Sequence, residues 1–156
     1  MSKDVGESAV PPAAAAVTTP AHGRCLCGAV QFRILGPLRA VIYCHCNMCR
    51  RSTGHFLAAT ACARSDLVVS GDALQWYASS PSARRGFCRH CGSNLFWDPI
   101  GEPRMSVLAG SLDPPTGLHE MGHIFVAEAG DYYRFADGLP QSDGWGLPLA
   151  VPGASP

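Results

Sequence analysis

Lysine and long apolar runs are scarce in this chain of 156 residues. Eleven arginines stand against a single lysine, Lys3, and no segment approaches the roughly 18 apolar residues of a membrane-spanning helix. The N-terminal stretch at 10–17 is short and broken by proline, and acids precede it, so it does not match the apolar core of a signal peptide. These absences lead us to expect a cytoplasmic protein with no membrane partner.

The formal net charge is zero, but the charges are unevenly placed. Residues 24–98 hold nine arginines against three aspartates, whereas residues 99–156 hold two arginines against seven acids. A basic half can indicate a nucleic-acid surface. Here the same half contains all eight cysteines, and metal-bound thiolates would offset about half of its excess charge. The sequence therefore disfavours nucleic acid as a partner, and it points to no particular oligomer.

Helical periodicity is also missing, because no run of a dozen residues carries an apolar stripe free of glycine and proline. Val30, Phe32 and Ile34 instead alternate with polar residues, as in a half-buried strand. Further short strands are expected at 39–43, 55–62, 67–70, 74–78, 84–88, 94–97, 104–109 and 122–127, with one helical turn at 47–51. The pattern predicts an all-β fold of short antiparallel strands, with one domain at 23–145 between flexible tails at 1–22 and 146–156.

Two of the three tight cysteine groups predict a closed metal site. Each is followed by a glycine, Gly28 or Gly92, which can take a positive φ and let backbone N–H groups point at the sulfurs. Such spacings bind metal more often than they form disulfides where thiols stay reduced. Together the two groups offer four sulfurs to a structural zinc ion, and these are Cys25, Cys27, Cys88 and Cys91.

The middle group, Cys44, Cys46 and Cys49, has no fourth cysteine beside it. Three protein ligands and one open position are typical of catalytic zinc. An open zinc can hold water or a thiol as its thiolate. Arg50 and Arg51 follow at once and are candidates to bind an anionic part of the substrate. The sequence thus predicts two zinc ions per chain, the second of them catalytic through these three cysteines.

The middle group is also compatible with another ligand set. A structural site of three cysteines and one histidine is the alternative to an open site, and His45 could face either way. We expect His123 to be a packed, hydrogen-bonded strand residue, His90 to be solvated, and Cys62 to be a small buried residue in an apolar strand. Seven cysteines do not suit two complete iron–sulfur clusters.

The order of these motifs resembles one family. Cys-x-Cys-Gly, Cys-x-Cys-x-x-Cys-Arg and Phe-Cys-x-x-Cys-Gly-Ser-x-Leu-Phe-Trp are similar to the glutathione-dependent formaldehyde-activating enzymes, which include centromere protein V-like domains. The resemblance spans about 23–140. It implies a β-tent fold stapled by zinc and the same division of the seven cysteines between two zinc ions. One departure is an aromatic pair, Tyr132 and Tyr133, where relatives often carry tryptophan.

The resemblance also implies an activity. The family name describes addition of a small thiol, glutathione, to formaldehyde, which gives S-hydroxymethylglutathione. A zinc-dependent carbon–sulfur lyase acting on a thiol–aldehyde adduct is therefore expected. A positioned thiolate needs little further help, and the sequence shows no Ser-His-Asp set or carboxylate pair that would act as a general base. The alternative function is a non-catalytic, zinc-stabilised interaction module or thiol carrier.

Overall fold

The computed structural model describes residues 20–151. Residues 1–19 and 152–156, which belong to the tails expected at 1–22 and 146–156, lie outside this part of the chain. Within it the fold is dominated by strands, as the sequence predicts. Strands form β1 (Ala21–Arg24), β2 (Gln31–Ile34), β3 (Val41–Cys44), β4 (Leu57–Ala63), β5 (Leu67–Ser70), β6 (Leu74–Ser80), β7 (Ala83–Cys88), β8 (Asn94–Pro99), β9 (Arg104–Leu108), β10 (Glu120–Ile124) and β11 (Gln141–Ser142).

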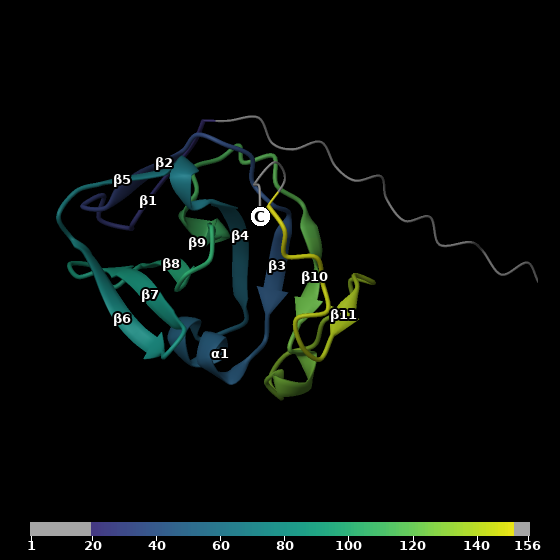
Figure 1. The fold of residues 1–156 in the computed structure, drawn as a ribbon. Coiled ribbons are helices and arrows are strands. Elements are labelled where there is room, and N and C mark those ends of the chain that lie inside the picture. The colour runs from purple at the N-terminus through teal and green to yellow at the C-terminus, as the bar shows by residue number, and fades with distance from the viewer. Residues whose placement is uncertain (1–19, 152–156) are drawn as a thin grey trace, which may run out of the picture.

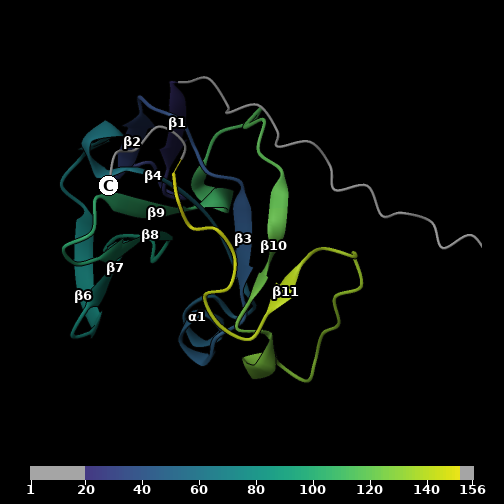
Figure 2. The same ribbon diagram turned by 45° about the vertical axis from the view of Figure 1, so that its right-hand side comes forward.

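Two sheets make up the molecule. The larger has the order β11-β10-β3-β4-β9-β8-β7-β6, which runs from right to left in Figure 1. The smaller has the order β1-β2-β5 and lies at the upper left in both Figure 1 and Figure 2. The single α-helix among the described residues, α1 (Asn47–Thr53), directly follows β3 and lies at the lower end of the larger sheet. It is longer than the one turn expected at 47–51.

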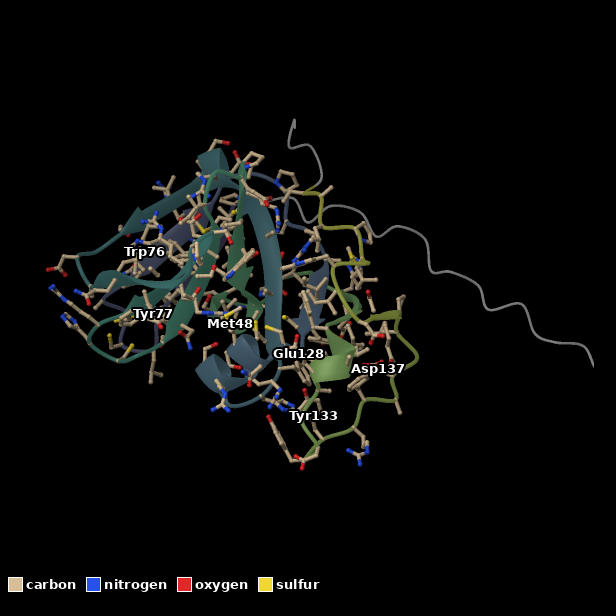
Figure 3. The ribbon with its side chains drawn as sticks, turned by 60° about the horizontal axis from the view of Figure 1, so that its bottom comes forward. Met48, Trp76, Tyr77, Glu128, Tyr133 and Asp137 are labelled. Carbon is tan, nitrogen blue, oxygen red and sulfur yellow. The ribbon has the colours of Figure 1, made fainter. Side chains whose placement is uncertain are left out.

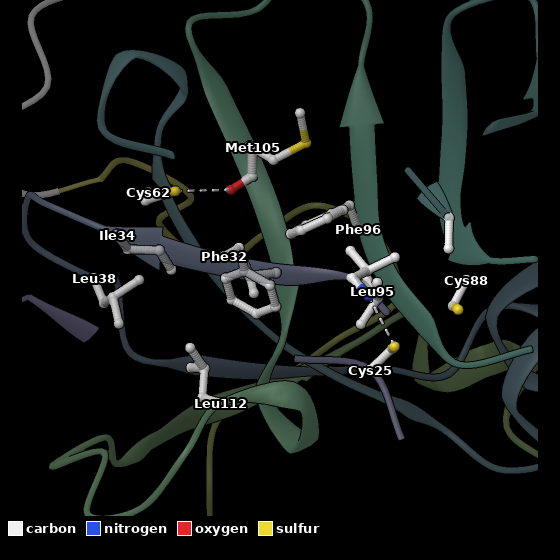
Figure 4. Close-up of a cluster of buried hydrophobic side chains, with 13 residues drawn as sticks. Cys25, Phe32, Ile34, Leu38, Cys62, Cys88, Leu95, Phe96, Met105 and Leu112 are labelled. Atoms are coloured by element: carbon white, nitrogen blue, oxygen red, sulfur yellow. Dashed lines mark hydrogen bonds between the residues drawn. The ribbon is translucent and has the colours of Figure 1, made fainter. Parts of the chain in front are cut away.

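Buried side chains form two clusters. The first lies between the two sheets and includes Phe32, Ile34 and Phe96, and Figure 4 shows Cys25 and Cys88 at one side of it. The alternating burial of β2 follows from its alternating sequence, because successive side chains of a strand point to opposite faces. The second cluster includes Ile42 and Ile124 together with Cys44 and Cys49. Each cluster therefore contains cysteines from one of the groups that the sequence assigns to metal.

Three details differ from the expectations. Strand β1 begins at Ala21, inside the expected N-terminal tail, because it pairs with β2. Strand β10 runs parallel to both β3 and β11, although most pairs are antiparallel as expected. The segment after 146 packs back on the domain: Leu147 and Leu149 contact the second cluster, and Val151 is buried. The expected flexible tail at 146–156 is therefore wrong for 146–151.

No helix within residues 20–151 has the length and apolar character needed to cross a bilayer.

Candidate metal centres

Two turns from different sheets bring four cysteines together. Cys25 and Cys27 follow β1. Cys88 is the last residue of β7, and Cys91 lies in the turn between β7 and β8. Their sulfurs all lie within 4.8 Å of one another, with 3.5 Å between Cys25 and Cys27 and 3.8 Å between Cys27 and Cys88. A zinc–sulfur bond of about 2.3 Å places sulfurs at tetrahedral corners about 3.8 Å apart. The donor set fits a tetrahedral metal ion.

Backbone conformation prepares these sulfurs for the ionised state. Gly28 and Gly92 have φ values of 79° and 74°, which confirms the positive φ expected after each group. The backbone N–H of Val30 donates to the Cys25 sulfur at 3.3 Å. Hydrogen bonds from Ser93, through its side chain and then its backbone, lower the pKa of Cys91 to about 5. Donors directed at sulfur favour the thiolates that a metal ion requires.

The second cluster is built where β3 passes into α1. The sulfurs of Cys44, Cys46 and Cys49 lie within 4.8 Å of one another, and Cys46 caps α1 by accepting from the backbone N–H of Cys49 at 3.4 Å. Hydrogen bonds from the thiols of Cys44 and Cys49 lower the pKa of Cys46, whereas hydrogen bonds with Cys46 and Cys49 raise the pKa of Cys44. Three sulfurs this close ionise together only beside a cation, so this donor set also fits a metal ion.

A cavity of about 330 Å³ opens beside the second cluster and is lined by its three cysteines. Two further sets of side chains face it. One set is cationic and consists of Arg39, Arg85 and Arg104; the other is aromatic and consists of Trp97, Phe125 and Trp145. Figure 3 looks at this end of the molecule and labels Met48 of α1 and Glu128, which both line the cavity. The cavity thus offers sulfur, positive charge and an apolar surface to one ligand.

Phe125 is held in an uncommon conformation at the edge of this cavity. Its φ of 57° lies in the left-handed region, which is strained for a bulky residue and is often found at functional sites. The Phe125 ring meets Trp145 edge to face, with centroids 4.9 Å apart. This conformation ends β10 and turns the aromatic ring toward the cavity.

The motifs that form both clusters also decide the family. A model of the family described as glutathione-dependent formaldehyde-activating enzyme matches residues 20–128, which include all seven clustered cysteines. The chain belongs to this family. The resemblance stated from the motifs is confirmed.

Three relatives illustrate the similarity of this family member to known proteins. An uncharacterized lyase of Schizosaccharomyces pombe is 32% identical over 76 residues, which are 49% of this chain and 56% of that protein. A Halomonas elongata protein provisionally named as a glutathione-dependent formaldehyde-activating enzyme is 29% identical over 116 residues, 64% of this chain and 73% of that protein. A crystal structure of a Rhodobacter sphaeroides protein matches with a TM-score of 0.54 at 28% identity, covering 65% of this chain and 98% of that one.

The remaining cysteine and two of the histidines lie where the sequence places them. Cys62 is fully buried in β4, with its sulfur 4.0 Å from the Met105 carbonyl oxygen, and it joins neither cluster (Figure 4). His90 is exposed. His123 is buried in β10 and hydrogen-bonded. These three expectations are confirmed.

Arg50 and Arg51 lie on α1, outside the lining of the cavity. The Arg50 Nε donates to the backbone oxygen of Glu128 at 2.9 Å, and the Arg51 Nε donates to the Asn47 side chain at 3.0 Å. The Glu128 carboxylate in turn accepts from the backbone N–H of Asn47 at 2.8 Å. Arg50 and Glu128 thus tie the start of α1 to the segment after β10, and a substrate role for Arg50 or Arg51 stays a prediction.

The sequence did not foresee a hydrogen-bonded chain behind the second cluster. His45 faces inward: its Nε2 lies 2.8 Å from His123 Nδ1, and its Nδ1 lies 2.8 Å from the Tyr133 hydroxyl. His123 Nε2 lies 2.9 Å from the Asp137 carboxylate. The chain therefore runs Asp137, His123, His45, Tyr133. Tyr133, the departure from the family pattern, has a polar contact as well as a packing role.

The carboxylate at one end sets the direction of the bond that it shares with His123. Burial and then the neighbouring His123 lower the pKa of His45 to about 4, so it is neutral at pH 7. An ionised carboxylate only accepts, so Nε2–H of His123 donates to Asp137. Where the neutral His45 donates its Nε2–H to His123 Nδ1, its Nδ1 accepts from the Tyr133 hydroxyl. The turn that carries Cys44 and Cys46 is thereby anchored to β10 and the following loop.

The sequence also did not predict that Arg39, Arg85 and Arg104 line the cavity, although the position of Arg39 in the sequence is unusual. Arg39 interrupts the apolar run from Leu38 to Ile42, and a cation in a buried strand region is uncommon unless it has a partner or a function. Arg85 lies in β7 and Arg104 in β9, and nothing in either short stretch of sequence separates a buried arginine from an exposed one.

Proposed function

We propose that this chain is a zinc-dependent carbon–sulfur lyase that acts on the adduct of a small thiol such as glutathione with an aldehyde, as in formation of S-hydroxymethylglutathione. The observation that carries the proposal is the three-sulfur cluster facing a cavity large enough for a small ligand. The family membership and the names of the relatives agree with it.

In this proposal the two clusters divide the work. Cys25, Cys27, Cys88 and Cys91 hold a structural zinc ion, and Cys44, Cys46 and Cys49 hold a second one. The second ion, when bound, supplies a Lewis acid that lowers the pKa of a thiol and orients its sulfur. Arg85 stands beside this cluster, with Nη2 3.7 Å from the Cys49 sulfur, and its charge stabilises the cysteine thiolates. The proposal places the protein in a reducing compartment such as the cytoplasm, where such thiols persist.

The reaction requires only placement of the two reactants. In the synthetic direction a thiol sulfur attacks the formaldehyde carbon. One carbon–sulfur bond forms as the π bond of the carbonyl group breaks, and the proton lost by the thiol ends on the aldehyde oxygen. In the lyase direction the carbon–sulfur bond breaks, the carbonyl π bond forms again, and the proton returns to sulfur. Trp97, Phe125 and Trp145 exclude water from one side of the cavity and hold the ligand near the cysteines.

Two measurements test the proposal. Metal analysis of the purified protein should find two zinc ions per chain. Exchange spectroscopy by NMR with ¹³C-formaldehyde and glutathione should show faster interconversion of free and adduct carbon with protein than without it. Cys46→Ser should abolish the acceleration, whereas Cys62→Ser should retain it, because Cys62 lies in neither cluster. An exchange rate independent of the protein, together with no binding of glutathione, would favour the alternative of a non-catalytic module.

A further inference from the structure

One of the three arginines that line the cavity, Arg39, has no counter-charge among the described residues. Arg39 precedes β3 and lines the cavity, yet only 2% of its surface is exposed. Its Nη2 donates to the Ala59 carbonyl oxygen at 3.1 Å. Its Nε and Nη1 have no hydrogen-bond partner within the described part of the chain, and no carboxylate of residues 20–151 forms an ion pair with it.

An unpaired buried guanidinium destabilises a fold. Burial and, to a smaller extent, the charge of Arg104 lower the pKa of Arg39 to about 10. Arg39 is therefore still protonated at neutral pH. Removing a charge from water without a partner or full hydrogen bonding is costly, and well-packed apolar replacements are often as stable or more so. A residue kept against this cost indicates a gain elsewhere, and here the charge stands at a cavity wall.

The neighbouring charges do not neutralise Arg39. Arg104 pairs with Glu102, with 2.8 Å between Nε and Oε2. Arg85 faces the sulfur of Cys49, where it balances thiolate charge. The carboxylate of Glu128, which also lines the cavity, accepts from the start of α1. The positive charge of Arg39 is therefore the one left for a ligand.

We propose that this cavity selects thiols that carry a carboxylate, and that Arg39, with Arg104 beside it, is the specificity-determining group that holds the carboxylate while the sulfur faces Cys44, Cys46 and Cys49. This inference rests on the proposed function, because it takes the ligand to be a thiol. It assigns the carboxylate to the cavity wall formed before β3 and by β9, rather than to Arg50 and Arg51 of α1. A guanidinium shielded from bulk water attracts an anion more strongly than one at the surface.

The experiment compares two thiols of equal size and different charge. Zinc-loaded protein is titrated calorimetrically with 3-mercaptopropionate and with 3-mercaptopropionamide. The wild type should bind the carboxylate at least about tenfold more tightly than the amide, as expected for a charge-assisted hydrogen bond. Arg39→Met should remove most of this preference, because it weakens binding of the carboxylate thiol. Its affinity for the amide thiol should stay within about twofold of the wild-type value. Arg39→Lys, which keeps the charge, should restore part of it.

Matched variants separate the possible explanations. Arg33→Met makes the same chemical change on the exposed face of β2, away from this cavity, and should keep the wild-type preference. Arg51→Met tests the assignment to α1. Loss of preference in Arg51→Met with none in Arg39→Met would overturn the inference. So would equal affinities of the wild type for both thiols, and that result would leave the proposed function standing.

Stability provides a second readout. Because Arg39 lacks a counter-charge, Arg39→Met should unfold in urea at the wild-type midpoint or above it and retain its metal. A lower midpoint with an unchanged carboxylate preference would show that Arg39 is merely structural and would overturn the inference. Should Arg39→Met fail to fold, Arg39→Lys must reduce the preference relative to the wild type, and an unchanged preference would overturn the inference. If the wild type binds neither thiol, the proposed function fails together with the inference.

Discussion

At the scale of single residues, the hydrogen-bonded chain from Asp137 to Tyr133 holds the turn that carries Cys44 and Cys46. His45 lies between Cys44 and Cys46, so its ring direction and the direction of the two sulfurs are coupled through one stretch of backbone. The Asp137 carboxylate accepts from His123 Nε2–H, and the pKa of Asp137 is lowered by the backbone N–H of Leu139 and then by His123. Groups behind a metal site commonly tune its affinity.

We therefore expect Asp137→Asn to weaken metal retention at the second cluster. An amide can donate where the carboxylate only accepts, so the bond to His123 Nε2 is no longer held in one direction. Zinc affinity, measured by competition with a chromogenic chelator, should fall roughly tenfold or more for one of the two ions. Asp131→Asn is the control, because its exposed side chain lies in the same loop outside this chain of bonds. Equal affinities for the two variants would show that the chain does not position the cluster.

At the scale of elements, an ion-pair group joins three segments at the edge of the first core. Asp98 of β8 is only 2% exposed and contacts both Arg64, which follows β4, and Arg84 of β7. Burial raises the pKa of Asp98, but hydrogen bonds and charges of the two arginines outweigh it, and the pKa is lowered. Arg84 also stacks over Trp76, 4.3 Å from the ring centroid.

This geometry predicts an acid-sensitive contribution to stability. A carboxyl whose folded pKa is depressed stabilises the fold at pH values above its unfolded pKa, and the contribution is lost as the pH falls through the folded value. Asp98→Asn should lower the free energy of unfolding at pH 7 by about 2–3 kcal/mol. The gap between wild type and variant in urea unfolding should shrink toward acid pH. A gap that stays constant from pH 7 to 3 would contradict the assignment.

The four-cysteine cluster also acts between elements, since it joins the two sheets. Cys25 and Cys27 belong to the turn of the three-stranded sheet, and Cys88 and Cys91 to that of the eight-stranded sheet. Because Cys25 and Cys88 are also part of the first core, loss of the metal would open that core.

Cys88→Ser should therefore destabilise the whole domain, by more than about 4 kcal/mol, because a metal staple is lost. Cys46→Ser should leave a folded protein with weakened binding at the second cluster alone. Thermal unfolding and metal content per chain distinguish the two variants. A Cys88→Ser protein with wild-type stability and two bound metal ions would show that the four cysteines do not form one site.

At the scale of the whole molecule, the two clusters differ in what surrounds them. One joins two sheets with four sulfurs, and the other offers three sulfurs to a cavity. A site with an open position exchanges its metal more readily than a closed one.

Mild chelation should remove about one metal ion per chain first and leave the circular dichroism spectrum unchanged. The ion that remains, at the four-cysteine cluster, should leave only under conditions that unfold the domain. Metal release followed by a chromogenic chelator, with the spectrum recorded in parallel, tests this order. Simultaneous loss of both ions with unfolding would contradict the division into a structural and an open site.

The sequence alone determined the features that depend on short spacing. The cysteine steps, the glycines at positive φ and the alternation of β2 are local patterns, and each can be recognised within a few consecutive residues. The family followed from the order of these motifs, and the grouping of Cys25 and Cys27 with Cys88 and Cys91 followed from counting ligands. The pairing of β10 parallel to β3 did not, because strand direction depends on how the chain returns across the sheet.

Only the tertiary structure decided which charges face the cavity. Arg50 and Arg51 are adjacent to a cysteine in the sequence, but α1 directs their Nε atoms to Glu128 and Asn47. Arg39, Arg85 and Arg104 come from three distant segments that meet at one wall. The same holds for His45 and His123, 78 residues apart. Proximity of this kind arises when sheets and turns close on one another, and no local pattern encodes it.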